Sequence, residues 1–335
     1  MINEALVIQY ACRGTYSPDC LRLERREVPE LADGEVLIRP SLLSIDPTSR
    51  NWLKLEPQSN VFGLRVGGVM KGQCVGEVVA SNSTRFAPGD MVTALAGWER
   101  LSVVPQDFVQ PSLPGISAEA HLTIFSHIGL AAATGLLDVA KLRRDDVVVV
   151  SGAAGATGSI AVALAVAHGA RVVGIAGGAE KCRLVVEQLG AEAAIDYKAQ
   201  DIEAELRRLC PDGVTLFFDN VGGAVLDAVL MNMALHSRIA VCGQIALYNS
   251  ADRNDGQGVR NLMELVFRRI RMEGFIAGEP REQVPANIAE LRELYEAGKI
   301  VSRAHIVVGL ANAPAAVDLL FRGQNDGKVI VELPQ

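Results

Sequence analysis

The chain has 335 residues, of which 49% are hydrophobic, a length and composition that suit two globular domains with sizeable cores. Its 32 basic and 39 acidic residues give a net charge of −7, which argues against a nucleic-acid partner. The N-terminus lacks the basic start and apolar run of a signal peptide, and no apolar run approaches the ~18 residues that a membrane span needs. We therefore expect a cytoplasmic protein with no membrane association.

The six cysteines and five histidines are scattered along the chain. No Cys-x-x-Cys pair occurs, and the histidines show no metal-ligand spacing. In a long acidic chain of this kind we expect reduced thiols, several of them serving as small core residues. The spacing gives no support to a zinc site, although ligands far apart in the sequence stay open.

Residues 1 to about 120 predict a β-rich domain. Short strand-like runs are separated by turn sequences containing Gly and Pro, with no helical pattern between them, which is typical of a compact barrel or sandwich. The runs are Ala5–Gln9, Glu35–Pro40, Cys74–Ala80 and Met91–Leu95. Helical sequence begins near Ala118, and Ile128–Val139 is predicted to form one helix.

From Asp146 onward, strands and helices alternate. The predicted strands are Val147–Val150, Arg171–Ala176, Ala193–Ile195, Val214–Phe218, Arg238–Cys242 and Met272–Ile276. The predicted helices are Gly158–His168, Glu180–Leu189, Ile202–Leu209, Ala224–Met233, Leu262–Arg269 and Ala286–Ala297. Because the strands are almost wholly apolar, we expect a doubly wound parallel α/β sheet that binds ligands at the carboxyl ends of its strands. The last segments, from Arg303 to Glu332, are expected to return to the first domain.

A glycine-rich turn joins the first of these strands to its helix, with the sequence Ser151-Gly-Ala-Ala-Gly-Ala-Thr-Gly158. Glycine has no Cβ, so the backbone can approach a ligand closely, and the helix N-terminus that follows favours a phosphate. We interpret the turn as a cradle for the pyrophosphate of a dinucleotide. Ala153 occupies the first glycine position of Gly-x-Gly-x-x-Gly, so a plain strand–helix connection is the alternative.

The tip of the second strand predicts which dinucleotide binds. An NAD-preferring unit carries Asp or Glu there for the adenosine ribose, whereas this strand ends in Gly177-Gly178. Lys181 follows, and a cation at this place suits the 2′-phosphate of NADP(H); an ordinary solvated lysine is the alternative. Tyr197, after the third strand, would add a hydroxyl to the same phosphate or else be a surface aromatic residue.

These features together resemble a zinc-independent medium-chain dehydrogenase/reductase. More narrowly, nearly the whole chain is similar to the branch of leukotriene B4 dehydrogenase, prostaglandin reductase and alkenal double-bond reductase. The order and spacing of nine segments carry the resemblance, namely Leu43–Arg50, Ala153–Gly158, Glu180-Lys181, Ile195–Lys198, Phe218–Gly223, Arg238–Gly243, Tyr248-Asn249, Arg271–Phe275 and Gly323–Lys328.

The resemblance implies a GroES-like β-barrel catalytic domain over residues 1–120, rejoined by residues 300–335, and a Rossmann NADP-binding domain over residues 121–299. It also implies NADP(H) and a homodimer. The cofactor positions that it implies are Gly155, Ala156, Thr157 and Gly158 at the pyrophosphate, Lys181 and Tyr197 at the 2′-phosphate, and Asn220, Cys242, Gly243, Tyr248, Phe275, Ile276, Ala277 and Asn325 along the nicotinamide half. On the residues alone, Asn220 also reads as a turn residue and Asn325 as part of a hairpin turn.

The implied reaction is hydride transfer from NADPH to the β-carbon of an α,β-unsaturated ketone or aldehyde. Negative charge then develops on the carbonyl oxygen, where a hydrogen-bond donor stabilises it. Zinc-dependent relatives carry an early cysteine ligand, whereas Ser44–Arg50 contains none, so we expect no metal site and no zinc-assisted alcohol oxidation. The substrate would be a small lipophilic enone or enal.

Tyr248 is the predicted catalytic residue, placed near the nicotinamide ribose by the resemblance. Several family members have a second tyrosine where Phe267 stands here, which leaves prostaglandin-type specificity open; core packing is the alternative for Phe267. Trp98 matches a position that lines the substrate cleft in relatives, although packing in the barrel is slightly favoured. An NADPH quinone reductase and a non-catalytic NADPH-binding protein stay open as alternative functions.

Overall fold

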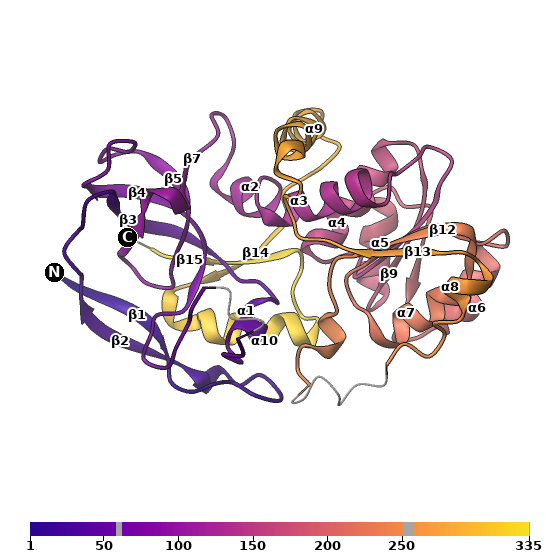
Figure 1. Cartoon of the computed structure of the whole chain (residues 1–335), viewed down its shortest axis with the longest axis horizontal. Helices are drawn as coiled ribbons and strands as arrows, with labels where there is room; N and C mark the ends of the chain where they lie inside the picture. Colours follow the sequence, from indigo (N-terminus) through magenta and orange to yellow (C-terminus); the bar gives the residue numbers. More distant parts are fainter. Residues whose placement is uncertain (58–61, 251–257, 335) are drawn as a thin grey trace. The chain divides into compact units, whose positions relative to one another are not determined.

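The structure, a computed structural model, describes residues 1–57, 62–250 and 258–334. The chain divides into two compact units (Figure 1). The first comprises residues 1–122, 248–251 and 304–335, and the second comprises residues 123–247 and 252–303. Within the described ranges, none of the helices has the length and apolar composition needed to cross a bilayer.

The first unit is built on a seven-stranded sheet, mostly antiparallel, with the order β14-β15-β3-β4-β5-β7 and with β6 paired to β3. Its strands are β3 (Glu35–Ser44), β4 (Lys71–Ser81), β5 (Met91–Gly97), β6 (Ser102–Pro105), β7 (Val109–Pro111), β14 (Ala304–Val308) and β15 (Lys328–Glu332). A separate ribbon is formed by β1 (Ile2–Ile8) and β2 (Leu21–Glu27). One buried cluster fills this barrel-like unit, and α10 (Ala313–Arg322) contributes its apolar face to that cluster.

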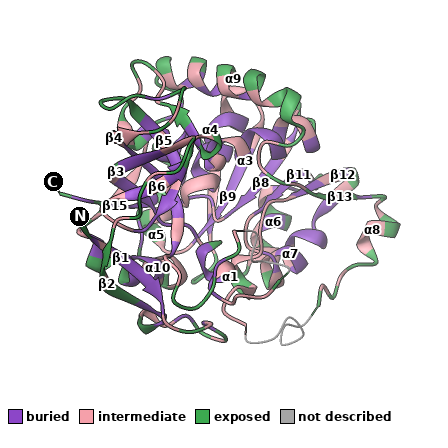
Figure 2. Ribbon diagram, turned by 60° about the vertical axis from the view of Figure 1, so that its left-hand side comes forward, coloured by how far each residue is buried: buried purple, intermediate pink, exposed green. Residues whose placement is uncertain are grey.

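The second unit contains a six-stranded parallel sheet of order β10-β9-β8-β11-β12-β13. The strands are β8 (Val147–Ser151), β9 (Arg171–Ala176), β10 (Ala193–Asp196), β11 (Val214–Asp219), β12 (Met233–Val241) and β13 (Arg271–Gly274). Figure 2 shows the central strands as largely buried. The chain order of these strands reverses between β8 and β11, which is the switch point at which doubly wound sheets bind ligands. The predicted fold class is confirmed.

Helices cover both faces of this sheet, and each face has its own apolar cluster. One cluster includes α3 (His127–Ala133), α4 (Ala156–Ala167) and α9 (Val284–Glu296), and the other includes α6 (Ile202–Leu209) and α7 (Gly223–Leu230). The remaining helices of the sheet are α5 (Ala179–Glu187) and α8 (Glu264–Phe267).

Two predicted helices differ from the structure. The helix expected over Ala224–Met233 ends at Leu230, because Asn232 turns the chain with hydrogen bonds to Ala228 and Val229, and Met233 already begins β12. The helix expected over Ile128–Val139 changes after Ala133 into a π-helix over Thr134–Val139. No Gly or Pro marks the first change, and at the second Gly135 lies within a run of small and apolar residues, so the sequence pattern conceals both.

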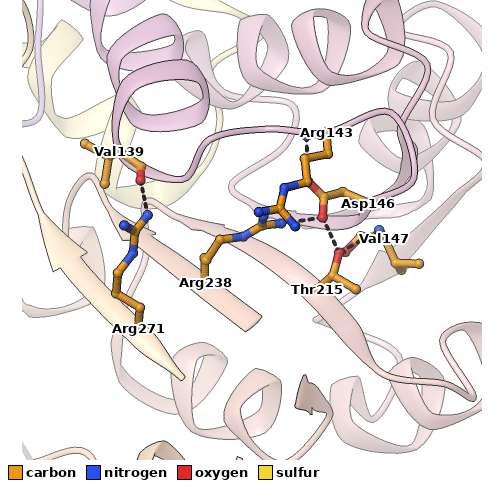
Figure 3. Close-up of polar contacts among 7 residues, drawn as sticks. All are labelled: Val139, Arg143, Asp146, Val147, Thr215, Arg238 and Arg271. Atoms are coloured by element: carbon orange, nitrogen blue, oxygen red, sulfur yellow. Dashed lines mark hydrogen bonds and ion pairs between the residues drawn. The ribbon is translucent and has the colours of Figure 1, made fainter. Parts of the chain in front are cut away.

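A buried polar cluster ties together β8, β11 and β12 at the end of the sheet opposite the glycine turn (Figure 3). The Asp146 carboxylate accepts hydrogen bonds from the Arg143 N–H (2.7 Å) and the Thr215 hydroxyl (2.7 Å), and it forms an ion pair with Arg238. The Thr215 hydroxyl in turn accepts from the Val147 N–H at 2.9 Å. The cluster fixes the register of the three strands, so we assign it to stability.

Candidate cofactor site at the carboxyl ends of the strands

The geometry of the turn after β8 requires glycine at two of its three glycine positions, Gly152 and Gly158. Gly152 has φ +61°, a left-handed conformation that glycine adopts without strain. A Cβ built on Gly158 would lie 2.1 Å from the Gly152 carbonyl oxygen, so the first turn of α4 packs directly on the backbone of the loop. Gly155 is the N-cap residue, and no described side chain caps it. The N–H groups at the start of α4, including those of Ala156 and Thr157, are therefore available to an anion.

Ala153 stands where the dinucleotide motif has its first glycine, and its surroundings explain why alanine is tolerated. The residue is fully buried. Opposite it, β9 carries Gly174, where an added Cβ would lie 2.8 Å from the Ala153 Cβ and 2.5 Å from Val185 Cγ1. The missing side chain at Gly174 thus provides the space that the Ala153 methyl group fills. Glycine is therefore needed at Gly174 in the neighbouring strand, where it leaves space for alanine at the first glycine position of the motif.

Asp219 joins the ends of β8 and β11. Its Oδ1 accepts hydrogen bonds from the Ser151 hydroxyl (2.8 Å) and from the N–H groups of Val221 and Gly222 (both 3.0 Å). Asn220 completes the link, because its N–H donates to Ser151 Oγ at 2.8 Å and its side-chain amide to the Ser151 carbonyl at 2.7 Å. Asn220 is thus part of a turn, as one interpretation of the sequence held, and its predicted role along the nicotinamide half stays a prediction.

The Asp219 carboxyl group is fully buried, and its second oxygen has no hydrogen-bond partner among the described residues. Burial raises the pKa of Asp219, although the three donors oppose the rise. Its main-chain carbonyl accepts hydrogen bonds from the N–H groups of Cys242 (2.8 Å) and Gly243 (3.1 Å) after β12. Burial also raises the pKa of the Cys242 thiol to about 12, so this side chain is neutral near pH 7. Sequence reasoning did not single out Asp219 or Ser151.

The tip of β9 forms the second part of the site. The Tyr197 ring lies over Gly177, where an added Cβ would be 2.8 Å from Tyr197 Cε1 and 2.9 Å from its hydroxyl oxygen. Lys181 lies in the first turn of α5, three residues after the N-cap Gly178. A carboxylate does reach this tip from β10, since Asp196 Oδ1 accepts from the Gly178 N–H at 2.8 Å. The sequence of β9 alone did not indicate this contact.

Phe275, Ile276 and Ala277 follow β13. The Phe275 ring packs against Phe218, with 6.2 Å between centroids, one residue before Asp219. A Cβ on Gly135 would lie 2.6 Å from Phe275 Cζ, so the π-helix packs closely here. Ile276, in contrast, is exposed in the chain. The structure therefore brings the predicted positions of the second unit to the carboxyl ends of β8, β9, β11, β12 and β13.

Tyr248 and Asn325 belong to the first unit, so the fold of the second unit does not position them beside the other predicted cofactor residues. Asn325 is buried, and its side-chain amide donates to the Gly327 carbonyl at 2.8 Å. The hairpin reading of Asn325 is wrong, because its turn joins α10 to β15. Tyr248 is partly exposed and immediately precedes Asn249, whose side chain is firmly bound.

Two open readings are settled. Trp98 is fully buried in the core of the first unit, and a Cβ on Gly72 would lie 2.5 Å from its Nε1, so it packs the barrel. Phe267 is 64% exposed on α8, so the core-packing alternative is wrong in the isolated chain. Among the residues that the structure describes, no group of three or more His, Cys, Asp and Glu side chains is arranged to hold a metal ion.

The strand order and the glycine turn define the second unit as a Rossmann dinucleotide-binding unit. Family models agree with this class: one described as the N-terminal domain of oxidoreductase matches residues 5–111, and one described as zinc-binding dehydrogenase matches residues 156–293. The chain belongs to the medium-chain dehydrogenase/reductase family, in a branch of NADP-dependent reductases, and the expected resemblance is confirmed.

Several relatives match over nearly their whole length. The NADPH-dependent curcumin reductase of Escherichia coli (strain K12) is 34% identical, with 99% of this chain and 97% of the relative covered. The NADP(+)-dependent 2-alkenal reductase of Nicotiana tabacum is 36% identical, with 91% and 89% covered. The crystal structure of CurA in complex with NADPH from Vibrio vulnificus has a TM-score of 0.92 and 33% identity, with 99% of both chains covered.

Proposed function

We propose that the protein is an NADPH-dependent reductase of the C=C bond of α,β-unsaturated ketones and aldehydes. The observation that carries the proposal is the cradle in the second unit. Its glycine turn, the β9 tip under Tyr197 and the nearby Lys181 fit a dinucleotide with a 2′-phosphate. The curcumin and 2-alkenal reductases among the relatives support the substrate class.

The residues of the cradle divide the binding task. The start of α4, with Gly155, Ala156, Thr157 and Gly158, would hold the pyrophosphate by main-chain N–H groups. Lys181 and Tyr197 would bind the 2′-phosphate through an ammonium group and a hydroxyl. When bound, NADPH supplies the hydride for the β-carbon of the substrate.

On the nicotinamide side, Asn220, Cys242, Gly243 and the segment after β13 would line the ring. Asp219 and Ser151 hold Asn220 in one orientation through hydrogen bonds within the protein. The Tyr248 hydroxyl is our candidate donor for the charge that develops on the carbonyl oxygen. Phe267 cannot take this role, because its side chain has no hydroxyl. Asn325 stays a predicted cofactor residue.

We further propose that the reaction proceeds without zinc. The segment Ser44–Arg50 has no cysteine, and its one carboxylate is already engaged. Asp46 pairs with the buried Lys328 ammonium at 2.6 Å and accepts a hydrogen bond from the Ser44 hydroxyl at 2.5 Å. Burial lowers the pKa of Lys328, and Asp46 opposes that shift. A tightly paired carboxylate of this kind is a poor ligand for a metal ion.

The expected homodimer is also a proposal, and β13 is the edge that suits it. On its free side no described strand pairs with β13, and α8 beside it exposes Val266 and Phe267. Two copies of β13 paired antiparallel about Met272 would set Arg271 opposite Glu273 of the partner subunit, a complementary charge pair. Phe267→Asp should then give a monomer by light scattering, and an unchanged dimer would contradict this edge. The expected cytoplasmic location stays a prediction.

The proposed activity is tested by NADPH oxidation with matched panels of enals, enones and quinones, each repeated with NADH. We expect turnover of enals or enones with NADPH preferred. Lys181→Glu should reverse or abolish that preference, since it places a carboxylate where the 2′-phosphate lies. Turnover of quinones alone would overturn the enone assignment. Tight NADPH binding without oxidation by any acceptor would support a non-catalytic role.

A further inference from the structure

Arg50 is a fully buried arginine in the first unit, on α1 (Ser49–Trp52). Its guanidinium donates hydrogen bonds from Nε to Asn249 Oδ1 at 3.1 Å, from Nη1 to the Cys12 carbonyl and from Nη2 to the Gly14 carbonyl. Burial lowers the pKa of Arg50 from the ordinary arginine value. Desolvating a guanidinium is costly, and a hydrogen bond from each of the three nitrogens offsets part of that cost.

Asn249 is the point where these bonds meet the segment that carries Tyr248. Its Oδ1 accepts the Arg50 Nε–H and also the Tyr16 N–H, the latter at 3.2 Å. The Lys54 ammonium donates to the Ser250 carbonyl at 3.1 Å. Asn249 and Ser250 are thereby fastened to the first unit, although the preceding residues 123–247 belong to the second. Consecutive Cα atoms are ~3.8 Å apart, so whatever fixes Asn249 also fixes the backbone of Tyr248.

We propose that Arg50 is a positioning residue for Tyr248, acting through Asn249. The inference rests on the proposed function in so far as Tyr248 serves the reaction. The planar guanidinium fork reaches three acceptors at once, which a lysine ammonium on a flexible stem cannot reproduce. Loss of the fork lets the 248–250 segment shift, and a displacement of about 1 Å at a reacting group lowers the rate by about 100-fold. NADPH affinity changes little, because the proposed pyrophosphate and 2′-phosphate contacts all lie in the second unit and Tyr248 is predicted only for the nicotinamide half.

The variants for the test are Arg50→Lys, Asn249→Ala and Tyr248→Phe, together with Tyr248→Phe/Asn249→Ala. Asn249→Ala removes the shared acceptor but leaves the bonds from Arg50 to Cys12 and Gly14, so it serves if Arg50→Lys fails to fold. Leu53→Ala is the matched control, because Leu53 is equally buried in the same core and its side chain has no hydrogen bond to lose. It should lower Tm without changing kcat per folded enzyme.

Two readouts separate positioning from catalysis. With 3-fluorotyrosine at position 248, ¹⁹F NMR should show a changed or broadened signal in Asn249→Ala and Arg50→Lys, and an unchanged one in Leu53→Ala. With enone and NADPH, kcat should fall at least tenfold in both variants while the Kd for NADPH stays within about twofold. In the Tyr248→Phe background, Asn249→Ala should cause little further loss.

The inference is overturned if the ¹⁹F signal in Asn249→Ala matches that of the unmodified chain, or if the losses of kcat from Asn249→Ala and Tyr248→Phe multiply. A changed ¹⁹F signal combined with full turnover in Tyr248→Phe has a different meaning. It would support the positioning of Tyr248 by Arg50 while removing Tyr248 from the proposed reaction.

Discussion

Gly158→Ala tests the glycine turn most directly. The added methyl group would lie 2.1 Å from the Gly152 carbonyl oxygen, 2.8 Å from the Gly152 carbonyl carbon and 3.0 Å from Ala153 Cα. All three atoms are backbone and cannot rotate away. Close-packed interiors do not absorb such an overlap, so the loop and α4 must separate by roughly 1.3 Å to reach ordinary contact. We expect the overpacking to cost about 2–3 kcal/mol of unfolding free energy, which is about 4–12 °C in Tm for a unit of this size.

The same displacement withdraws the N–H groups of α4 from the phosphate position, so the Kd for NADPH should rise at least about tenfold, or ~1.4 kcal/mol. Gly155→Ala is the matched control. Gly155 has φ −78°, which alanine adopts freely, and the Gly152 carbonyl oxygen at 3.1 Å is the one described atom within 4 Å of the added methyl group. This variant should keep its Tm and lose NADPH affinity, because its methyl group projects into otherwise open space at the cradle.

Tm follows from thermal unfolding by circular dichroism, and Kd from NADPH fluorescence. A Gly158→Ala protein with wild-type Tm and Kd would refute the packing argument. If Gly155→Ala loses as much stability as Gly158→Ala, the argument is wrong that Gly158 is needed for packing whereas Gly155 is needed only for NADPH binding.

Two further predictions concern stability. Asp146→Ala removes the ion-pair partner of the largely buried Arg238 guanidinium and should lower the free energy of unfolding in urea by about 3–5 kcal/mol. The Kd for NADPH should stay unchanged, because the cluster lies at the end of the sheet opposite the glycine turn. A loss of less than about 1 kcal/mol would contradict the assignment of this cluster to stability. Burial raises the pKa of Cys74 from 9.0 to about 12. The stability that the buried neutral thiol contributes to the folded state is therefore fully present below pH 9 and is lost as pH rises toward 12. The stability difference between wild type and Cys74→Ala should therefore shrink by up to about 4 kcal/mol over that range, and a constant difference would argue against the burial effect.

The centre of the parallel sheet could be predicted because β8, β9 and β11 are buried on both faces and appear in the sequence as nearly unbroken apolar runs. The strands that escaped prediction lack that signal. β2 (Leu21–Glu27) exposes most of its charged residues and pairs with β1 alone, so no apolar face marks it. The short β7 and the irregular start of β12, where His236 has φ +59°, are shaped by neighbouring strands and carry no local pattern.

The site shows the same limit. The glycine turn is local and could be read directly from residues 151–158. The contact from Ser151 to Asp219 spans 68 positions, and the contact from Arg50 to Asn249 spans 199, so neither leaves a periodicity in the sequence. Trp98 shows the converse: a residue that matched a substrate position by resemblance is held in the core by Gly72. Contacts between residues that are far apart in the sequence can be identified only once the arrangement of the strands is known.

The division of the chain adds a mechanistic point. The positions proposed for the pyrophosphate and the 2′-phosphate belong to the second unit, whereas Tyr248 directly precedes Asn249 and Ser250, which are fastened to the first. Binding of the cofactor and positioning of the proposed donor thus depend on different cores, one built around the parallel sheet and one around the barrel-like sheet. Substitutions that break the hydrogen bonds from Arg50 or Lys54 to residues 249–250 should therefore change kcat with little change in NADPH affinity, whereas substitutions at the ends of β8 and β9 should act first on NADPH binding.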